Sequence, residues 1–396
     1  MILTAGSLEK LIKEGEVIVG KGIMELVNLK IEKIAGNAFK NYGNISTLRI
    51  KRCGLKEIDP VAFRSLKSLE TLDLSHNEIE RIENGTFLHL EALEQLALYN
   101  NKIEDIEKMA FWGMSTLKQL YIAGNRIRII KELTFHELPA LEELDLSENR
   151  ISVIEPNAFS ELPLLRRINL WNNSVKEIRG DEFRSLISLE EINWGENAIK
   201  ELFPNCFEKL PNLKWIVLWR NKLEVVPSGT FLNHTNLQEI SLAENNIRII
   251  HSGAFSNLPK IQLINLRANP IKVIEAQAFQ NLPKLQSIDF AETQIELIEE
   301  NAFQGLDTLR AIEMTCIQLS PNTFRDMPLL QTVSLSKTRM NEEDLALAFA
   351  AVGSKNEIRV YISGINHALM NNLCNLLGVN ARFHSARARF SLFRGI

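Results

Sequence analysis

The sequence predicts a protein built from tandem structural repeats, each of which contributes one short β-strand. Two observations lead to this prediction. A pattern of leucine, asparagine and phenylalanine returns every 24 residues, and apolar and polar residues alternate at the start of each repeat. The pattern runs from about Lys21 to Met340 of the 396-residue chain. A fixed period of roughly 20–50 residues is typical of repeat architectures, in which each unit packs only against its neighbours.

Each repeat begins with an L-x-x-L-x-L segment, such as Leu69, Leu72 and Leu74. Successive side chains of a strand point to opposite faces, so the leucines lie on a core face and the residues between them lie in water. Counting from the first leucine, the third, fifth, seventh and eighth positions of every repeat form the water-facing surface, which we call the strand face. The same position in successive repeats forms a column, in which neighbouring residues lie about 4.8 Å apart, the spacing of paired strands.

Two further residue types mark the repeat. An asparagine follows the strand, where its amide can bond the backbone groups of its own turn and of the neighbouring turn, which predicts a ladder of buried asparagines. Asparagine holds this register at positions 77, 101, 125, 149, 173, 197, 221, 245 and 269. Phenylalanine recurs from Phe39 to Phe303, with a displaced copy at Phe324, and is expected to fill the interior.

With these positions in place, the chain resembles a leucine-rich repeat protein of the typical 24-residue class, without the cysteine-rich caps of extracellular animal members. The resemblance covers roughly four fifths of the sequence. It implies an α/β solenoid of horseshoe shape, with a parallel sheet of about 13 strands on the concave side and irregular or short helical segments on the convex side.

The ends of the chain depart from the repeat and predict three parts: an N-terminal helical cap (1–20), the repeat array (21–340), and a C-terminal cap with a basic tail (341–396). Apolar residues predict a helix around Leu8 and Leu11, because an open end of the array would expose core. After residue 340 the pattern predicts a helix around Leu345 to Phe349, a strand at Ile358–Ile362 and a second helix at Ala368–Leu377.

The C-terminal tail is basic and contains interleaved phenylalanines. No acidic residue follows Glu357, whereas arginines accumulate up to Arg394. Two interpretations stay open: the tail docks on the cap, or it contacts an anionic surface such as a lipid headgroup or a phosphorylated partner.

Composition excludes several classes of protein. The net charge of −4, with acidic and basic residues interspersed, argues against nucleic acid as the partner. No apolar stretch is long enough to span a membrane, so membrane contact is expected only through the basic tail. Cys53, Cys206, Cys316 and Cys374 lack the spacings of a disulfide framework and are expected to be free thiols. These thiols and the missing signal segment favour a cytoplasmic protein over a secreted one or a cell-surface ectodomain.

No catalytic, metal-binding or cofactor motif is present. The seven histidines lack ligand spacing and are expected in exposed loops, and the segment Gly20–Gly22 is expected to be a turn rather than a phosphate loop. We therefore expect neither an enzyme nor a metal or cofactor.

The strand face contains aromatic residues that core packing does not require. Tyr99, Trp171 and Trp219 fall in the seventh column, Tyr121 in the fifth and Trp215 in the third. Trp194, by contrast, replaces a core leucine, and Trp112 is expected on the convex side. The predicted ligand-binding set is Tyr99, Tyr121, Asp145, Trp171, Asn193, Gly195, Trp215, Trp219 and Arg220.

At the centre of this set we predict a clamp. Trp171 and Trp219 are two repeats apart, roughly 10 Å by strand spacing, with Gly195 between them and Arg220 alongside. Acidic residues around them would attract a protein or peptide carrying basic and apolar side chains. The alternative is structural: the acids keep an exposed sheet soluble, and the aromatics stack on one another across repeats.

The sequence thus predicts a non-enzymatic module of receptor, adhesion or scaffold type that binds a protein or peptide on its concave face. The alternative is a cytosolic regulatory or effector protein, in which the array selects a target and the C-terminal segment acts.

Overall fold

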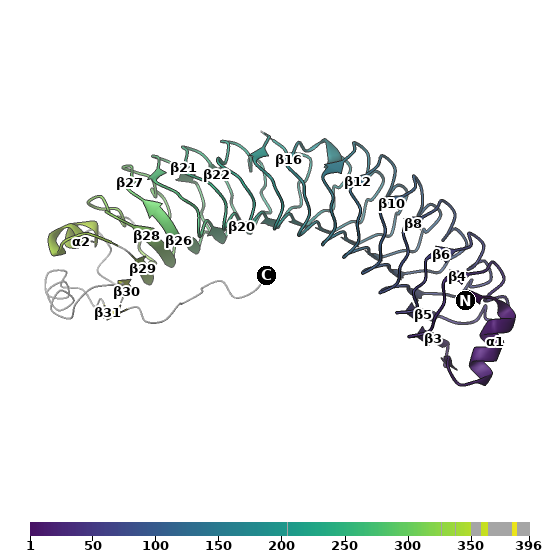
Figure 1. Cartoon of the computed structure of the whole chain (residues 1–396). Helices are drawn as coiled ribbons and strands as arrows, with labels where there is room; N and C mark the ends of the chain where they lie inside the picture. Colours follow the sequence, from purple (N-terminus) through teal and green to yellow (C-terminus); the bar gives the residue numbers. More distant parts are fainter. Residues whose placement is uncertain (204, 326, 337, 350–357, 363–381, 386–396) are drawn as a thin grey trace. The chain divides into compact units, whose positions relative to one another are not determined.

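The computed structural model describes residues 1–203, 205–325, 327–336, 338–349, 358–362 and 382–385. The chain divides into two compact units. Unit 1 comprises residues 1–199 and 209–213, and unit 2 comprises residues 200–208 and 214–396. Within each unit the repeats stack one on the next, and the first strand of each repeat lies on the same side of the stack (Figure 1).

In unit 1 the first strands form one sheet in which neighbours are parallel, and each residue lies opposite the equivalent residue of the next repeat, as Leu72 lies opposite Leu96. These strands are β3 (Ile23–Val27), β5 (Thr47–Lys51), β7 (Thr71–Asp73), β9 (Gln95–Ala97), β11 (Gln119–Tyr121), β13 (Glu143–Asp145), β15 (Arg167–Asn169) and β17 (Glu191–Asn193). The constant register shows that the 24-residue period holds in space as it does in sequence.

Unit 2 repeats the arrangement with one irregularity. Its sheet consists of β19 (Trp215–Val217), β20 (Glu239–Ser241), β23 (Leu263–Asn265), β26 (Ser287–Ile295), β28 (Ala311–Cys316), β29 (Thr332–Ser336), β30 (Arg359–Ile362) and β31 (Arg382–Ser385). Ala311 pairs with Thr332, so the repeat that begins there is shorter than the others. Strand β30 confirms the strand predicted at Ile358–Ile362, whereas β31 was not predicted.

The opposite side of each unit is built of turns and very short strands. In unit 1 these are β1 (Ile2–Leu3), β4 (Lys33–Ile34), β6 (Glu57–Ile58), β8 (Arg81–Ile82), β10 (Asp105–Ile106), β12 (Ile129–Ile130), β14 (Val153–Ile154) and β16 (Glu177–Ile178). In unit 2 they are β18 (Glu201–Leu202), β21 (Ile249–Ile250), β22 (Phe255–Ser256), β24 (Val273–Ile274), β25 (Phe279–Gln280) and β27 (Leu297–Ile298). In the described repeats only the 3-10 turn η1 (Asp181–Phe183) is helical, so this side is irregular rather than helical.

Stacked phenylalanines fill the interior between the two sides. From Phe39 to Phe183 in unit 1, successive ring centroids lie 5.6 to 6.3 Å apart with nearly parallel planes. A second stack runs from Phe207 to Phe303 in unit 2. Trp194 is 1% exposed and meets Phe183 edge-on, as its core position predicts.

The predicted asparagine ladder is present. The Asn101 side-chain oxygen accepts a hydrogen bond from the Ile79 amide of the preceding repeat, at 3.1 Å. Its amide nitrogen donates to the carbonyls of Leu74 and Leu98, each at 3.0 Å. Each such asparagine therefore satisfies buried backbone groups of two repeats at once, which ties the turns together.

The N-terminus forms the predicted helix and then a hairpin. Helix α1 (Ala5–Lys13) starts after Thr4, whose hydroxyl accepts a hydrogen bond from the Ser7 amide, and it buries Leu8 and Leu11. Strand β2 (Ile18–Gly20) then pairs antiparallel with β3. The two linking residues, Lys21 and Gly22, have φ values of 52° and 81°, as a two-residue type I′ turn requires. The turn predicted at Gly20–Gly22 is thus confirmed.

Helix α2 (Glu342–Phe349) follows β29 and agrees with the predicted helix. The second helix predicted at Ala368–Leu377, and the basic tail apart from β31, lie outside the described residues. None of the helices in the described ranges has the length and apolar character needed to cross a membrane.

The histidines were predicted to lie in exposed loops. His234 is 2% exposed, so the expectation that the histidines lie in exposed loops is wrong for this residue. It stands in the register that leucine holds in the neighbouring repeats, and its Nε2 lies 2.8 Å from the Phe207 carbonyl.

Cys53 and Cys316 are free thiols, as predicted. Burial raises the pKa of Cys53 and raises the pKa of Cys316 to about 12. Neither is a reactive thiolate near neutral pH.

The ladder predicts a large difference between two adjacent asparagines. Asn245 accepts from the Leu223 amide and donates to the Leu218 carbonyl, whereas Asn246 is exposed. Because Asn245→Ala leaves buried backbone groups unpaired, it should lower the free energy of unfolding by ~2 kcal/mol or more. Asn246→Ala should change it by less than ~0.5 kcal/mol. Urea denaturation followed by circular dichroism compares them, and equal losses would contradict the structural role of the ladder.

Candidate functional site

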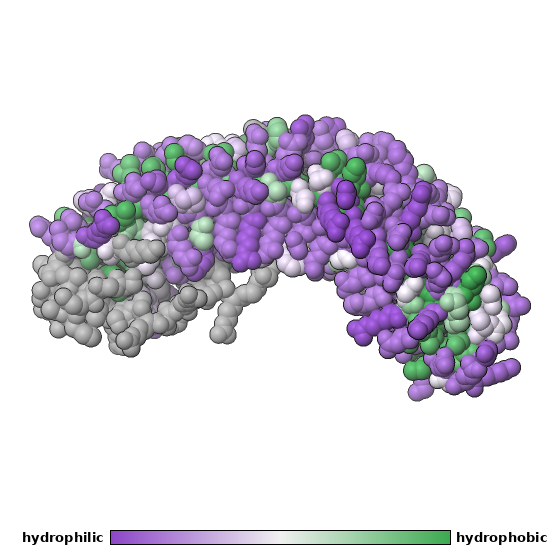
Figure 2. Space-filling view, viewed as in Figure 1, coloured by the Kyte–Doolittle hydropathy of each residue, from purple (hydrophilic) through white to green (hydrophobic). Residues whose placement is uncertain are grey.

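The strand face is polar in character in both units. Strand residues at the third and fifth positions, such as Glu143 and Asp145 of β13, are half-buried, while the leucine between them is fully buried. Figure 2 shows that the visible surface is mostly hydrophilic, with apolar side chains in small separate groups. Any specific site must therefore come from particular residues on this polar surface.

The predicted site residues are shared between the two units. Tyr99, Tyr121, Asp145, Trp171 and Asn193 are half-buried on the strand face of unit 1. Gly195 of unit 1 is buried, and its amide donates to the Asn193 side-chain oxygen at 2.9 Å. The remaining members, which belong to unit 2, are Trp215, Trp219 and Arg220. The clamp of Trp171 and Trp219 combines residues of both units and stays a prediction.

In unit 2, basic side chains of the protein itself lie over the rings of two tryptophans on the strand face. The Arg220 guanidinium lies 4.8 Å from the centroid of the Trp219 ring, and its Nε donates to Glu244 at 2.7 Å. The Lys214 ammonium lies 5.6 Å from the Trp215 ring centroid. Such cation–π contacts hold both indoles in place on the surface.

Trp171 has an unusual feature. Its indole Nε1 is buried and has no hydrogen-bond partner among the described residues. Its backbone amide, by contrast, donates to the Asn169 side-chain oxygen at 3.1 Å. A buried donor without an acceptor costs free energy, so an oxygen atom that reached this nitrogen would remove the cost.

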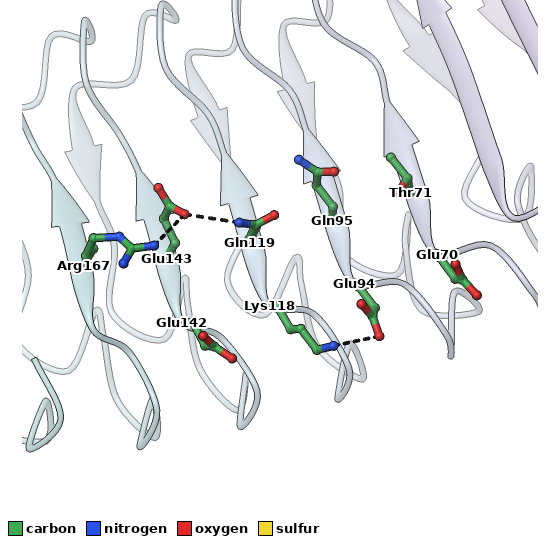
Figure 3. Close-up of a pocket in the computed structure, with 9 residues that line it drawn as sticks. All are labelled: Glu70, Thr71, Glu94, Gln95, Lys118, Gln119, Glu142, Glu143 and Arg167. Atoms are coloured by element: carbon green, nitrogen blue, oxygen red, sulfur yellow. Dashed lines mark hydrogen bonds and ion pairs between the residues drawn. The ribbon is translucent and has the colours of Figure 1, made fainter.

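A first cavity of about 310 Å³ opens on the strand face of unit 1 (Figure 3). Its lining residues are Glu70, Thr71, Glu94, Gln95, Lys118, Gln119, Glu142, Glu143 and Arg167. Two rows are visible: third-position residues on the strands, and second-position residues just before them. Second-position residues were not predicted to be part of the surface, although the charged residues that recur there were a usable signal.

Ion pairs cross this first cavity. Lys118 lies 2.8 Å from Glu94, and the Arg167 guanidinium donates to Glu143 at 3.2 Å. Gln119 and Tyr121 donate to the same carboxylate oxygen of Glu143, each at 3.3 Å. Burial, followed by the charge of Glu143, raises the pKa of Tyr121 to about 12, so its hydroxyl stays protonated at neutral pH.

A second cavity of about 500 Å³ lies beside the first. Its floor and walls come from four columns: Thr71 and Gln95 in the third, Arg49, Asp73, Ala97, Tyr121 and Asp145 in the fifth, Tyr99 and Ala123 in the seventh, and Asn100 and Glu148 in the eighth. Three of the predicted site residues, Tyr99, Tyr121 and Asp145, thus line one cavity.

Part of the acidic charge around these cavities is neutralised within the chain. Glu25 pairs with Arg49, Asp73 with Lys51 at 3.0 Å, and Glu143 with Arg167. In the part of the chain that the structure describes, Asp145 and Glu148 have no ion-pair partner. Glu70 and Glu142 of the first cavity also have no ion-pair partner among the described residues, so unpaired acids remain in both cavities.

One cluster could hold a metal ion. The ligand atoms of His136, Glu137 and Glu161, on the side opposite the strand face, lie within 4.8 Å of one another. His136 Nδ1 lies 2.9 Å from the Ser160 hydroxyl, and the Trp112 indole donates to Glu137 at 2.9 Å. Trp112 is 44% exposed, as its predicted place on this side requires.

Unit 2 carries a pair of acids on its strand face. Asp289 and Glu313 lie directly opposite each other on β26 and β28. Asp289 is 1% exposed and accepts a hydrogen bond from the Ala291 amide at 2.7 Å. Burial, together with the charge of Asp289, raises the pKa of Glu313 to about 7.

The sequence matches the family described as leucine rich repeat in seven overlapping segments: 23–79, 43–103, 68–127, 115–173, 163–223, 211–271 and 259–316. Together these span residues 23–316, well over half of the chain. Comparison with curated protein sequences found no match.

Solved structures share the fold at low sequence identity. A Drosophila Toll–Spatzle complex matches with a TM-score of 0.71 and 19% identity over 85% of this chain and 50% of that chain. An LRIM1/APL1C complex matches with a TM-score of 0.67 and 21% identity, covering 83% and 59% of the two chains.

A TLR13–ssRNA13 complex also matches, with a TM-score of 0.51 and 17% identity over 93% of this chain and 78% of that chain. Because a chain of similar fold occurs in a complex with RNA, the expectation that nucleic acid is excluded is not supported by the fold.

The acid pair of unit 2 predicts a pH dependence. The pKa of Glu313 rises from an ordinary value of 4.5 to about 7 on folding, because the folded protein favours the protonated side chain. The contribution of Glu313 to the free energy of unfolding is therefore complete below about pH 4.5 and is lost as pH rises through about 7. Glu313→Gln should therefore raise the melting temperature more at pH 8 than at pH 5. Glu300→Gln, at an exposed position, is the control. A Glu313→Gln effect that is the same at both pH values would contradict this assignment.

Proposed function

Because the chain belongs to the leucine-rich repeat family, we propose that it is a non-enzymatic recognition module that binds a protein or peptide on its strand face. The observation that carries the proposal is the group of half-buried aromatic residues, Tyr99, Tyr121 and Trp171, on a surface where packing of the repeat does not require them. Aromatic side chains of this kind commonly dominate the binding energy of protein interfaces.

The chemistry of the cavities supports a basic partner. The first is lined by four glutamates but only two cations, Lys118 and Arg167. The second contains Asp145 and Glu148, which have no ion-pair partner among the described residues. Such a surface attracts lysine and arginine side chains and repels phosphate, which favours a protein over RNA.

The lining residues also support binding rather than catalysis. Neither cavity is lined by a cysteine or a histidine, and their charged groups are mostly engaged in ion pairs. Nucleophilic catalysis needs a nucleophile next to a base, and the two cavities do not provide that combination. The Toll–Spatzle and LRIM1/APL1C complexes are consistent with this reading of the fold.

Affinity capture with the full chain, followed by mass spectrometry and nuclease treatment of a parallel sample, tests the proposal. A partner captured by the wild type should bind Trp171→Ala or Trp219→Ala at least about tenfold more weakly, with melting temperatures close to that of the wild type. Trp112→Ala, which removes an exposed indole on the opposite side, is the matched control and should keep the partner.

Loss of the partner from Trp112→Ala alone would place the interface on the other side and contradict the proposal. Loss of all binding after nuclease treatment would replace the protein partner by a nucleic acid.

A further inference from the structure

The second cavity of unit 1 has an internal pattern that its separate residues do not reveal. Ala97 and Tyr99 belong to one repeat, and Tyr121 and Ala123 belong to the next. Tyr121 lies opposite Ala97 across the β9–β11 pair. The two tyrosines therefore occupy one diagonal of a square of four positions, and the two alanines occupy the other. Large and small side chains arranged in this way leave a furrow between two aromatic rings.

Both rings are held by bonds at their hydroxyl groups. Tyr99 Oη accepts a hydrogen bond from the Lys51 ammonium at 3.4 Å, and its ring meets His76 edge-on with centroids 5.3 Å apart. Tyr121 Oη donates to Glu143 at 3.3 Å. The Lys51 ammonium also lies over the Tyr99 ring, 5.7 Å from its centroid. These contacts restrain both rings, so little conformational entropy is lost when a ligand stacks on them.

A carboxylate lies at one end of the furrow. Asp145 is opposite Tyr121 across the β11–β13 pair. One of its oxygens accepts a hydrogen bond from the Ser147 amide at 3.0 Å, and this bond orients the group. Its other oxygen has no hydrogen-bond partner among the described residues. Glu148, exposed at the same end of the cavity, adds a second negative charge.

Asp145 differs from the other fifth-position acids of unit 1. Glu25 and Asp73 each form an ion pair with a cation from an adjacent repeat. Within the described chain Asp145 has none. The cavity therefore has aromatic walls, a small floor and an uncompensated negative charge, which together are complementary to a cation on an apolar stem.

We propose that this furrow is a subsite for one cationic side chain of the partner, arginine in preference to lysine. The guanidinium stacks on the Tyr121 ring and on the face of the Tyr99 ring away from Lys51, and it donates two hydrogen bonds toward Asp145. Arginine is favoured because its planar group stacks on aromatic rings and binds carboxylates through two parallel N–H groups. This inference rests on the proposed function, since the side chain would belong to the protein or peptide bound on the strand face.

The test uses small probes in place of the unidentified partner. N-acetyl-arginine methylamide is titrated into the full chain and followed by saturation-transfer difference NMR, alongside the lysine analogue and the neutral citrulline analogue. The arginine probe should bind in the millimolar range, more tightly than the lysine probe, and binding should weaken with added salt. The citrulline probe should bind at least about tenfold more weakly.

Asp145→Asn is a conservative test variant, because Asn169 occupies the same column in the next repeat and accepts the equivalent backbone hydrogen bond. It should reduce arginine binding by about tenfold. The matched control is Asp289→Asn, an aspartate of the same column that also accepts an amide hydrogen bond two residues on, but lies in unit 2. It should leave arginine binding unchanged.

A second variant, Ala123→Leu, fills the furrow without changing any charge and should also abolish binding. Melting temperatures check that each variant is folded, and the comparison of arginine with citrulline on the wild type stands even if a variant is not. Equal binding of the two probes, no binding to the wild type, or equal effects of Asp145→Asn and Asp289→Asn would overturn the subsite.

Failure of the subsite is distinguishable from failure of the proposed function. If the probe does not bind but strand-face tryptophan variants still lose the captured partner, the subsite is wrong and the binding face stands. If the probe binds as expected while those variants retain the partner, the furrow is a cation site that the partner does not use, and the assignment of the partner's side chain is overturned.

Discussion

The asparagines that follow the strands from position 77 to position 269 are the constraint on which the rest of the structure depends. The side-chain amide of each pairs with backbone groups of its own repeat and of the one before, as Asn125 does with Ile103, Leu98 and Ile122. The backbone turn of each of these repeats is therefore held in register with the turn of the repeat before it. Once that register holds, the phenylalanines stack, the leucines align, and side chains 24 residues apart become neighbours on the strand face.

This neighbour relation also determines the electrostatics. Residues separated by 24 positions form ion pairs, as Arg49 does with Glu25 and Arg167 does with Glu143. Such exposed pairs contribute little to stability, about 0–1 kcal/mol each. Their larger effect is on recognition, because they cancel charge locally and leave unpaired groups, such as Asp145, to select a partner.

Sequence periodicity predicted most of the fold and part of the site. The strands of the 24-residue repeats, the ladder, the phenylalanine stack and buried Trp194 all follow from a position in the repeat, where one residue type has one physical role. The cavity residues were harder to predict. Lys118 and Glu142 stand at a second position that strand alternation alone does not assign to a surface. Histidine is polar, and on that ground His234 was predicted to be exposed. It is buried because it occupies the register that leucine holds in the neighbouring repeats. The partners of Asp73 and Glu143 depend on which acids meet which cations across repeats, and that requires the three-dimensional register.

The most direct test of the account places a photoreactive phenylalanine analogue, benzoylphenylalanine, at position 99 on the strand face or at position 112 on the opposite side. The captured partner should cross-link to the chain substituted at position 99 and not to the chain substituted at position 112. Cross-linking at position 112 alone, in a folded chain that still captures the partner, would contradict recognition through the strand face.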